Sequence, residues 1–137
     1  MSGTDSVERR VRDVPVIPVI VVDRLADAVP LAEALVAGGL PILEVTLRTP
    51  VALDAVSAIA AKVPTALVGV GSAIDPAQFA QAKNAGARFA VSPGATPALD
   101  AAARAAGIEW LPGAQTSSEV LALRAMGYRF MKFFPAQ

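Results

Sequence analysis

The sequence contains no cysteine and no histidine. Their absence excludes a disulfide framework, a thiol nucleophile and a Ser-His-Asp triad, and it removes the side chains that most often bind zinc. Any catalysis by this chain must therefore rely on lysine, arginine, carboxylates and hydroxyl groups.

An excess of charge of either sign is also missing, because twelve basic residues balance twelve acidic ones. No global field favours nucleic acid or an anionic membrane surface, so we expect a small molecule or a protein as the partner instead. A long apolar run is absent near the start, where charged residues, Pro15 and Pro18 interrupt the segment that a signal peptide would need. We therefore expect a soluble cytoplasmic protein.

Short runs of β-branched residues alternate with alanine-rich segments of helical length. With 137 residues and 54% hydrophobic content, the chain has the size and apolar content of one domain spanning residues 1–137. The runs are apolar on both faces, which indicates a parallel sheet covered by helices. Leu25, Val29 and Leu35 recur at helical spacing and predict the buried face of the first helix. We predict five helices between six strands, with the strands at residues 14–22, 41–47, 66–71, 88–93, 108–113 and 129–134.

Capping residues mark the predicted helix boundaries. A hydroxyl or carboxylate stands before a proline at Thr49, Asp75 and Thr96, and Thr116–Glu119 has the pattern of a capping box. Four glycines follow helical segments, where a left-handed residue ends a helix without steric cost. They are Gly38, Gly86, Gly107 and Gly127.

Polar residues stand at the carboxyl ends of several predicted strands. A strand–helix repeat folds either as an open doubly wound sheet, whose ligand lies at one crevice, or as a barrel, whose functional residues come from many strand ends. The wide distribution favours an α/β fold of the TIM-type (β/α) barrel kind. The residues at these ends are Glu44, Thr46, Arg48, Ser72, Ser92, Pro93 and Lys132.

Glu44, Thr46 and Arg48 alternate along one predicted strand, so they share one of its faces. One interpretation is an ion pair at the barrel mouth with a structural role only. The other is a general acid/base beside an arginine that holds a substrate carboxylate. The alternation alone leaves both open.

Lys132 lies in the aromatic run of residues 129–134, where alternation places Phe130, Lys132 and Phe134 on one face. The amine could extend past the strand end into water, as long cationic side chains often do. Alternatively, desolvation and a neighbouring cation such as Arg48 lower its pKa, and the neutral amine attacks carbonyl groups to form a Schiff base.

Five ordered segments carry a resemblance to a known family. They are "EVTLRT", "VGVGS", "AVSPG", "LPGAQTSSE" and "KFFPA". In this order they resemble the signature segments of the 2-keto-3-deoxy-6-phosphogluconate (KDPG) aldolases, a family that includes the 4-hydroxy-2-oxoglutarate (KHG) aldolases. The resemblance runs from about Val14 to the last residue and implies a homotrimeric barrel enzyme that works without a metal or another cofactor.

The resemblance also implies residue roles. Lys132 matches the Schiff-base lysine, Glu44 the carboxylate that moves protons, and Arg48 the residue that holds the pyruvate carboxylate. Ser72 stands where the family usually has a threonine that contacts the same pyruvate group. Pro93 and Phe134 match residues of the pocket wall.

The implied substrate is a small 2-keto acid. Cleavage of KDPG would give pyruvate and glyceraldehyde 3-phosphate, and the alternative substrate 4-hydroxy-2-oxoglutarate would give pyruvate and glyoxylate. The residues that separate the two substrates are expected beyond Gln137, because phosphate in such barrels is commonly bound by the loops after strands 7 and 8.

A complete barrel of this kind has eight strands, and only six are predicted here. We therefore expect an incomplete barrel, truncated after the Schiff-base strand. Three hypotheses remain: a truncated aldolase, a non-catalytic remnant whose sheet edges serve assembly, and an unrelated open-sheet phosphate-binding domain. The order of the five segments disfavours the third.

Overall fold

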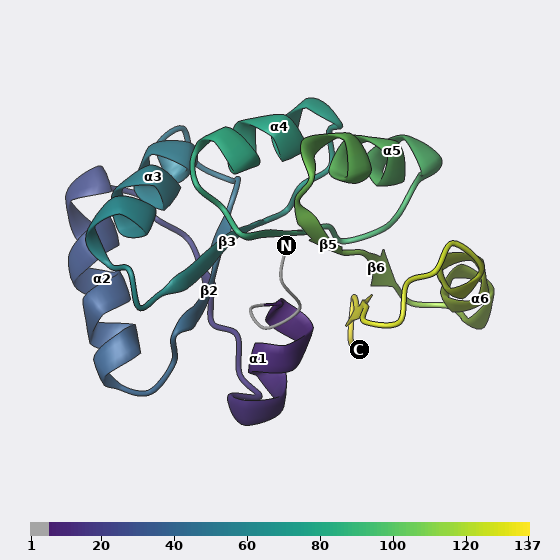
Figure 1. Ribbon diagram of the computed structural model, residues 1–137, viewed down its shortest axis with the longest axis horizontal. Helices are drawn as coiled ribbons and strands as arrows, with labels where there is room; N and C mark the ends of the chain where they lie inside the picture. Colours follow the sequence, from purple (N-terminus) through teal and green to yellow (C-terminus); the bar gives the residue numbers. More distant parts are fainter. Residues whose placement is uncertain (1–5) are drawn as a thin grey trace.

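The computed structural model describes residues 6–137, which form a curved parallel sheet with helices along its outer side (Figure 1). Each strand of the main sheet pairs in parallel with the strand before it in sequence, as in a barrel wall. A short parallel pair follows the main sheet. The predicted α/β partial barrel is therefore confirmed. The strands are β1 (Val19–Ile20), β2 (Ile42–Thr46), β3 (Leu67–Gly71), β4 (Phe89–Val91), β5 (Glu109–Leu111), β6 (Gly113–Ala114) and β7 (Lys132–Phe133).

The five predicted helices are present, and Figure 1 shows the first four of them along the convex side of the sheet. A further helix, α1, was not predicted and lies on the concave side. Ser6 caps it by accepting a hydrogen bond from the backbone N–H of Arg9 at 3.3 Å, and Val7 is fully buried. The helices are α1 (Val7–Asp13), α2 (Leu25–Ala37), α3 (Ala52–Lys62), α4 (Ala77–Asn84), α5 (Pro97–Ala106) and α6 (Ser117–Ala125).

Alternation along the strands divides the core in two. Leu43 and Val45 of β2 belong to an outer cluster between the sheet and its helices, whereas Ile42 belongs to an inner cluster on the concave side. The inner cluster fills the barrel below its carboxyl end. It consists of Val7, Ile42, Leu67, Phe89, Val91 and Leu111. The remaining inward positions of β2, Glu44 and Thr46, lie above this apolar layer, toward the carboxyl ends of the strands.

Three of the predicted strands are shorter in the structure, two of them because of prolines. Residues 14–22 were predicted as one strand, but only Val19–Ile20 pairs with β2, since Pro15 and Pro18 have no N–H to donate. Pro112 likewise divides the predicted strand 108–113 into β5 and β6. In the predicted strand 129–134, only Lys132–Phe133 forms a ladder.

The capping predictions are mostly confirmed. Thr96 accepts from the N–H of Leu99 at 3.2 Å, and Thr116 and Glu119 form a reciprocal capping box. Asp75 accepts from the N–H of Ala77 at 2.8 Å, but α4 begins at Ala77, so Asp75 stands one residue before the cap position. Thr49 was wrongly predicted as a cap. Its hydroxyl donates to the carbonyl of Val22 at 2.7 Å, and the helix begins only at residue 52.

Two details of α2 also differ from expectation. Gly38 has a right-handed backbone with φ of −78°, and Gly39 instead takes the left-handed conformation with φ of 88°. Leu25 is 43% exposed, whereas Ala28 and Ala32 are buried. The small side chains face the sheet because they let the helix approach it closely.

The charged start that argued against a signal peptide includes residues 1–5, which lie outside the described part.

Candidate active site

Glu44 is a buried carboxylate in the middle of β2, with 4% of its surface exposed. Thr46, two residues further along the same face, is fully buried and donates its hydroxyl to the carbonyl of Ile20 at 3.1 Å. The predicted shared face of these two residues is thus present. Thr46 ties β2 to β1, while the Glu44 side chain is left to point into the barrel.

Lys132 meets Glu44 across the barrel interior. Its Nζ lies 3.4 Å from Oε1 of Glu44, and the lysine side chain is 28% exposed. The backbone of Lys132 is fixed by its N–H, which donates to the carbonyl of Pro112 at 2.9 Å, and by pairing with Gly113. The amine therefore neither leaves the barrel for bulk water nor lies fully buried.

Burial raises the pKa of the Glu44 carboxyl above its ordinary value, because desolvation disfavours the charged form. The positive charges of Lys132 and Arg48 oppose this shift and favour the carboxylate. A carboxyl with a raised pKa holds a proton more readily than a free glutamate does, and the nearby cations still favour its release, so it is suited to act as a general acid/base.

Arg48 and Ser72 form a second contact at the same end of the sheet. The Nε of Arg48 donates to the Ser72 hydroxyl oxygen at 3.2 Å. Arg48 was predicted on the face of β2 but lies in the turn after it and is exposed. Ser72 follows β3 in a left-handed conformation, with φ of 57°. Within residues 6–137 the terminal nitrogens of Arg48 have no hydrogen-bond partner, so they remain available for an anion.

Phe134 and Pro93 complete the set of residues singled out in the sequence. The Lys132 Nζ lies 5.1 Å from the centre of the Phe134 ring, so this aromatic face adjoins the amine. Pro93 contacts the site indirectly. Its carbonyl oxygen lies against Gly113, where an added Cβ would be only 2.2 Å away, and Gly113 pairs with Lys132.

A cavity of about 220 Å³ opens between Glu44 and Lys132. Glu44 and Lys132 are the two charged groups of its wall and therefore its reactive part. The other lining residues are apolar, and they are Ile17, Val19, Val91, Leu111, Phe130 and Met131. Apart from Phe130, which alternation placed on the same face as Lys132, these apolar residues were not predicted from sequence. The structure brings Val19 to the site because it lies next to Glu44 in the parallel register.

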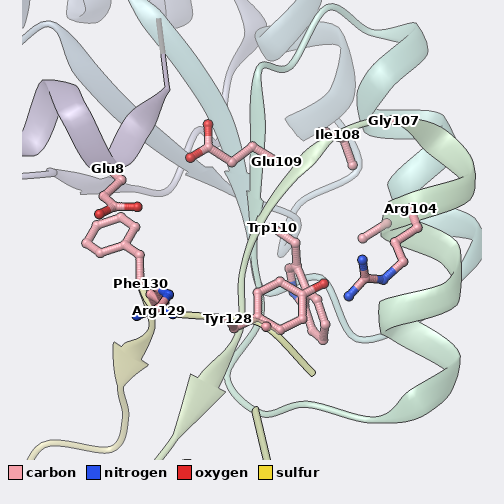
Figure 2. Close-up of a pocket in the computed structure, with 11 residues that line it drawn as sticks. Glu8, Arg104, Gly107, Ile108, Glu109, Trp110, Tyr128, Arg129 and Phe130 are labelled. Carbon is pink, nitrogen blue, oxygen red and sulfur yellow. The ribbon is translucent and has the colours of Figure 1, made fainter. Parts of the chain in front are cut away.

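A larger cavity of about 410 Å³ lies at the other end of β5 (Figure 2). Figure 2 shows Trp110 and Tyr128 close together on one side, with Glu8 and Phe130 on the other. Two of its polar groups are already engaged. Glu109 accepts from the N–H of Val7 at 3.0 Å, and the Tyr128 hydroxyl donates to Asp100 at 2.5 Å. It lacks the facing amine and carboxylate of the smaller cavity.

The described part of the chain holds neither a metal-binding cluster nor a membrane-spanning helix. Within residues 6–137, no group of three acidic, cysteine or histidine side chains is placed to hold a metal ion. No helix in this part of the chain is both long and apolar enough to cross a bilayer.

Curated proteins with similar sequences are aldolases. The KHG/KDPG aldolase of Escherichia coli K12 is 52% identical over 123 residues, which are 90% of this chain and 58% of that protein. The 2-dehydro-3-deoxy-phosphogluconate aldolase of Zymomonas mobilis is 47% identical over 137 residues, covering 100% of this chain and 64% of that protein. The chain thus spans about 58% of the length of the Escherichia coli relative.

Solved structures give the same result. A KDPG aldolase from Legionella pneumophila, with pyruvate captured as a covalent carbinolamine, has a TM-score of 0.85 and 52% identity over 89% of this chain and 59% of its own. The Zymomonas mobilis enzyme with 3-phosphoglycerate has a TM-score of 0.84 and 48% identity over 89% of this chain and 58% of its own. A family model described as KDPG and KHG aldolase matches residues 7–137. This chain therefore belongs to the KDPG and KHG aldolase family.

Proposed function

We propose that the protein is a class I aldolase that cleaves KDPG to pyruvate and glyceraldehyde 3-phosphate through a Schiff base on Lys132. The observation that carries this proposal is the 3.4 Å approach of the Lys132 amine to the buried Glu44 carboxyl, at the wall of a small apolar cavity. The carbinolamine in the related Legionella pneumophila structure supports it, because that intermediate is the first product of amine attack on a ketone.

The first stage builds the imine. The neutral Nζ of Lys132 attacks the C2 ketone, a C–N bond forms as the C=O π bond breaks, and one proton of the nitrogen passes to the oxygen to give the carbinolamine. Glu44 in its protonated form gives its proton to the C2 hydroxyl, which leaves as water, and the nitrogen lone pair completes the C=N bond. The resulting iminium at C2 is the electron sink for the next stage.

The second stage breaks the carbon–carbon bond. Glu44, now a carboxylate, takes the proton of the C4 hydroxyl, and the C4–O bond becomes the carbonyl of the aldehyde product. The electron pair of the C3–C4 bond moves to C3 and onto the iminium nitrogen, which gives an enamine. Glu44 then returns its proton to C3, and water hydrolyses the iminium to pyruvate and free Lys132.

Arg48 and Ser72 provide the proposed anchor for the substrate. The terminal nitrogens of Arg48 can pair with the carboxylate next to C2, while its Nε stays on the Ser72 hydroxyl. The contact with Ser72 fixes the direction of a side chain that is otherwise exposed. Phe134 and Pro93 are proposed to form the wall beside the amine, Phe134 directly and Pro93 through Gly113.

The experiment is a cleavage assay of the full gene product with both candidate substrates. Equal amounts of pyruvate and glyceraldehyde 3-phosphate from KDPG, at a higher kcat/KM than for release of glyoxylate from 4-hydroxy-2-oxoglutarate, are expected. The absence of pyruvate release from either substrate would refute the proposal.

Residues 1–137 are further proposed to be one domain of a cytoplasmic homotrimer that acts on a small 2-keto acid. The continuous outer cluster from β1 to β5 supports a single domain, and the family resemblance supports the trimer. Light scattering of the full gene product tests the assembly: a mass of three subunits supports it, and a monomer contradicts it.

A further inference from the structure

The two inward positions near the carboxyl end of β3 are both glycines, Gly69 and Gly71. Neither is among the glycines with a positive φ, so the backbone does not require glycine at either place. The requirement is for space. A Cβ on Gly69 would lie 2.5 Å from the Phe89 ring, and a Cβ on Gly71 would lie 2.1 Å from Oε1 of Glu44.

The two crowded contacts differ in what would have to move. The Phe89 ring is fully buried in the inner cluster, so a methyl group at residue 69 would disturb the apolar packing of the barrel. The neighbour of Gly71 is instead the flexible end of the Glu44 side chain. A methyl group at residue 71 would displace the carboxylate while leaving the sheet intact.

The displacement would separate Glu44 from Lys132. The Glu44 side chain starts opposite Gly69 in the β2–β3 register and extends along the inner face of β3 until its carboxylate lies on Gly71. From that position Oε1 is 3.4 Å from the Lys132 Nζ. An added Cβ on residue 71 would fill the space that the carboxylate now occupies. The carboxylate could then not keep both its place on β3 and its contact with the Lys132 Nζ.

We propose that Gly71 is a positioning residue, whose missing side chain lets the Glu44 carboxylate lie across β3 within reach of Lys132. This inference rests on the proposed function, in which Glu44 moves protons at the imine and at the C4 hydroxyl. Because a misplacement of about 1 Å costs on the order of 10²-fold in rate, a single methyl group at this place should affect the chemistry more than the fold.

The test compares Gly71→Ala, Glu44→Ala and the double variant in the full gene product. Gly71→Ala should lower kcat for cleavage on the order of 10²-fold, with little change in the pyruvate concentration that half-saturates trapping at Lys132. Alanine at residue 44 removes Cγ, Cδ and Oε1, the three atoms nearest to an added Cβ on Gly71. In the Glu44→Ala background, the alanine at residue 71 should therefore cause a much smaller further loss of kcat.

Gly38→Ala serves as the matched control. A Cβ there would lie 3.4 Å from the nearest atom, an ordinary contact, and the site is the end of α2, away from the barrel mouth. This variant should keep the kcat of the parent. If Gly71→Ala does not fold, recovery of folding in the double variant supports the overlap with Glu44, whereas failure of both assigns Gly71 a structural role and overturns the proposal.

A crystal structure of Gly71→Ala separates this inference from the proposed function. The Oε1–Nζ separation between Glu44 and Lys132 should grow beyond 3.4 Å whether or not the parent protein cleaves KDPG. An unchanged separation, or additive losses of kcat in the double variant, would overturn the role of Gly71. An absence of pyruvate trapping in the parent would instead refute the function.

Discussion

Lys132 and Glu44 are 88 positions apart in the sequence, and the lysine Nζ lies 3.4 Å from the glutamate Oε1. The two residues belong to β7 and β2, which share no backbone ladder, so their contact crosses the barrel interior. The pair therefore depends on the curvature of the whole sheet. Either member can be changed alone, which makes their proposed roles separable by mutation.

Glu44→Gln should slow cleavage of KDPG by about 10²–10⁴-fold, the range for loss of a general acid/base. The amide has nearly the same shape as the carboxyl but cannot exchange a proton, so pyruvate binding should change little. Steady-state kinetics and pyruvate affinity, measured on the same preparation, check this. Full activity in Glu44→Gln would leave the carboxylate with only a structural role.

Arg48→Ala should chiefly weaken the binding of pyruvate, because the terminal nitrogens of Arg48 are the proposed carboxylate anchor. Arg48→Lys should restore little, since an ammonium group cannot hold both the Ser72 hydroxyl and a carboxylate in the fork geometry of a guanidinium. Arg124→Ala, on the exposed side of α6, is the matched loss of one positive charge. Equal effects of Arg48→Ala and Arg124→Ala on pyruvate affinity would exclude a specific anchor.

The free energy of unfolding should depend on pH through the titration of Glu44. Its pKa is raised by burial, against the effect of Lys132 and Arg48, so the native state holds the proton more tightly than the unfolded chain does. This stabilising contribution is fully present below the ordinary glutamate pKa and is lost as the pH rises through the raised value.

Chemical denaturation of the parent and of Glu44→Gln, from about pH 4 to about pH 8, measures this contribution. The free energy of unfolding of the parent, relative to that of the variant, should decrease as the pH rises. A relative stability that increases over the same range would mean that the pKa of Glu44 is lowered in the native state.

A polypeptide limited to residues 1–137 should associate in solution. Among residues 6–137, β1 has a neighbour only at β2 and β7 only at β6. Large apolar side chains near these edges are exposed, with Val19 at 54% and Phe133 at 63%. Unpaired apolar edges favour pairing with other chains. Light scattering over a range of concentrations checks this, and a monomer at every concentration would show that these edges are protected.

The fold class was predictable because its signals are local. Alternating strand and helix segments, together with the caps at Thr96 and Thr116, mark most of the repeat before any contact is known. The strand ends were less predictable, since Pro112 divides one predicted strand and only the ladder partners decide where pairing stops. Helix α1 was missed because its short, charged segment buries mainly Val7.

The members of the candidate site were found from their positions at strand ends, but their contacts were not. Arg48 was predicted on a strand face but lies in the following turn, where its Nε donates a hydrogen bond to the Ser72 hydroxyl oxygen. The space that Gly71 leaves for Glu44 has no sequence signal, because any glycine in a strand could serve a close approach by another group. Only the packed structure shows which group approaches.

The most direct test is to trap the imine with pyruvate and borohydride in the full gene product and to map the modified peptide by mass spectrometry. The chain holds three lysines, and Lys62 and Lys83 lie exposed on helices outside the barrel. The reduced pyruvyl group should be found on Lys132, beside Glu44, and should be absent from Lys132→Arg. Modification of Lys62 or Lys83 in its place, or equal modification of the protein and its Lys132→Arg variant, would contradict the assignment of Lys132 as the nucleophile.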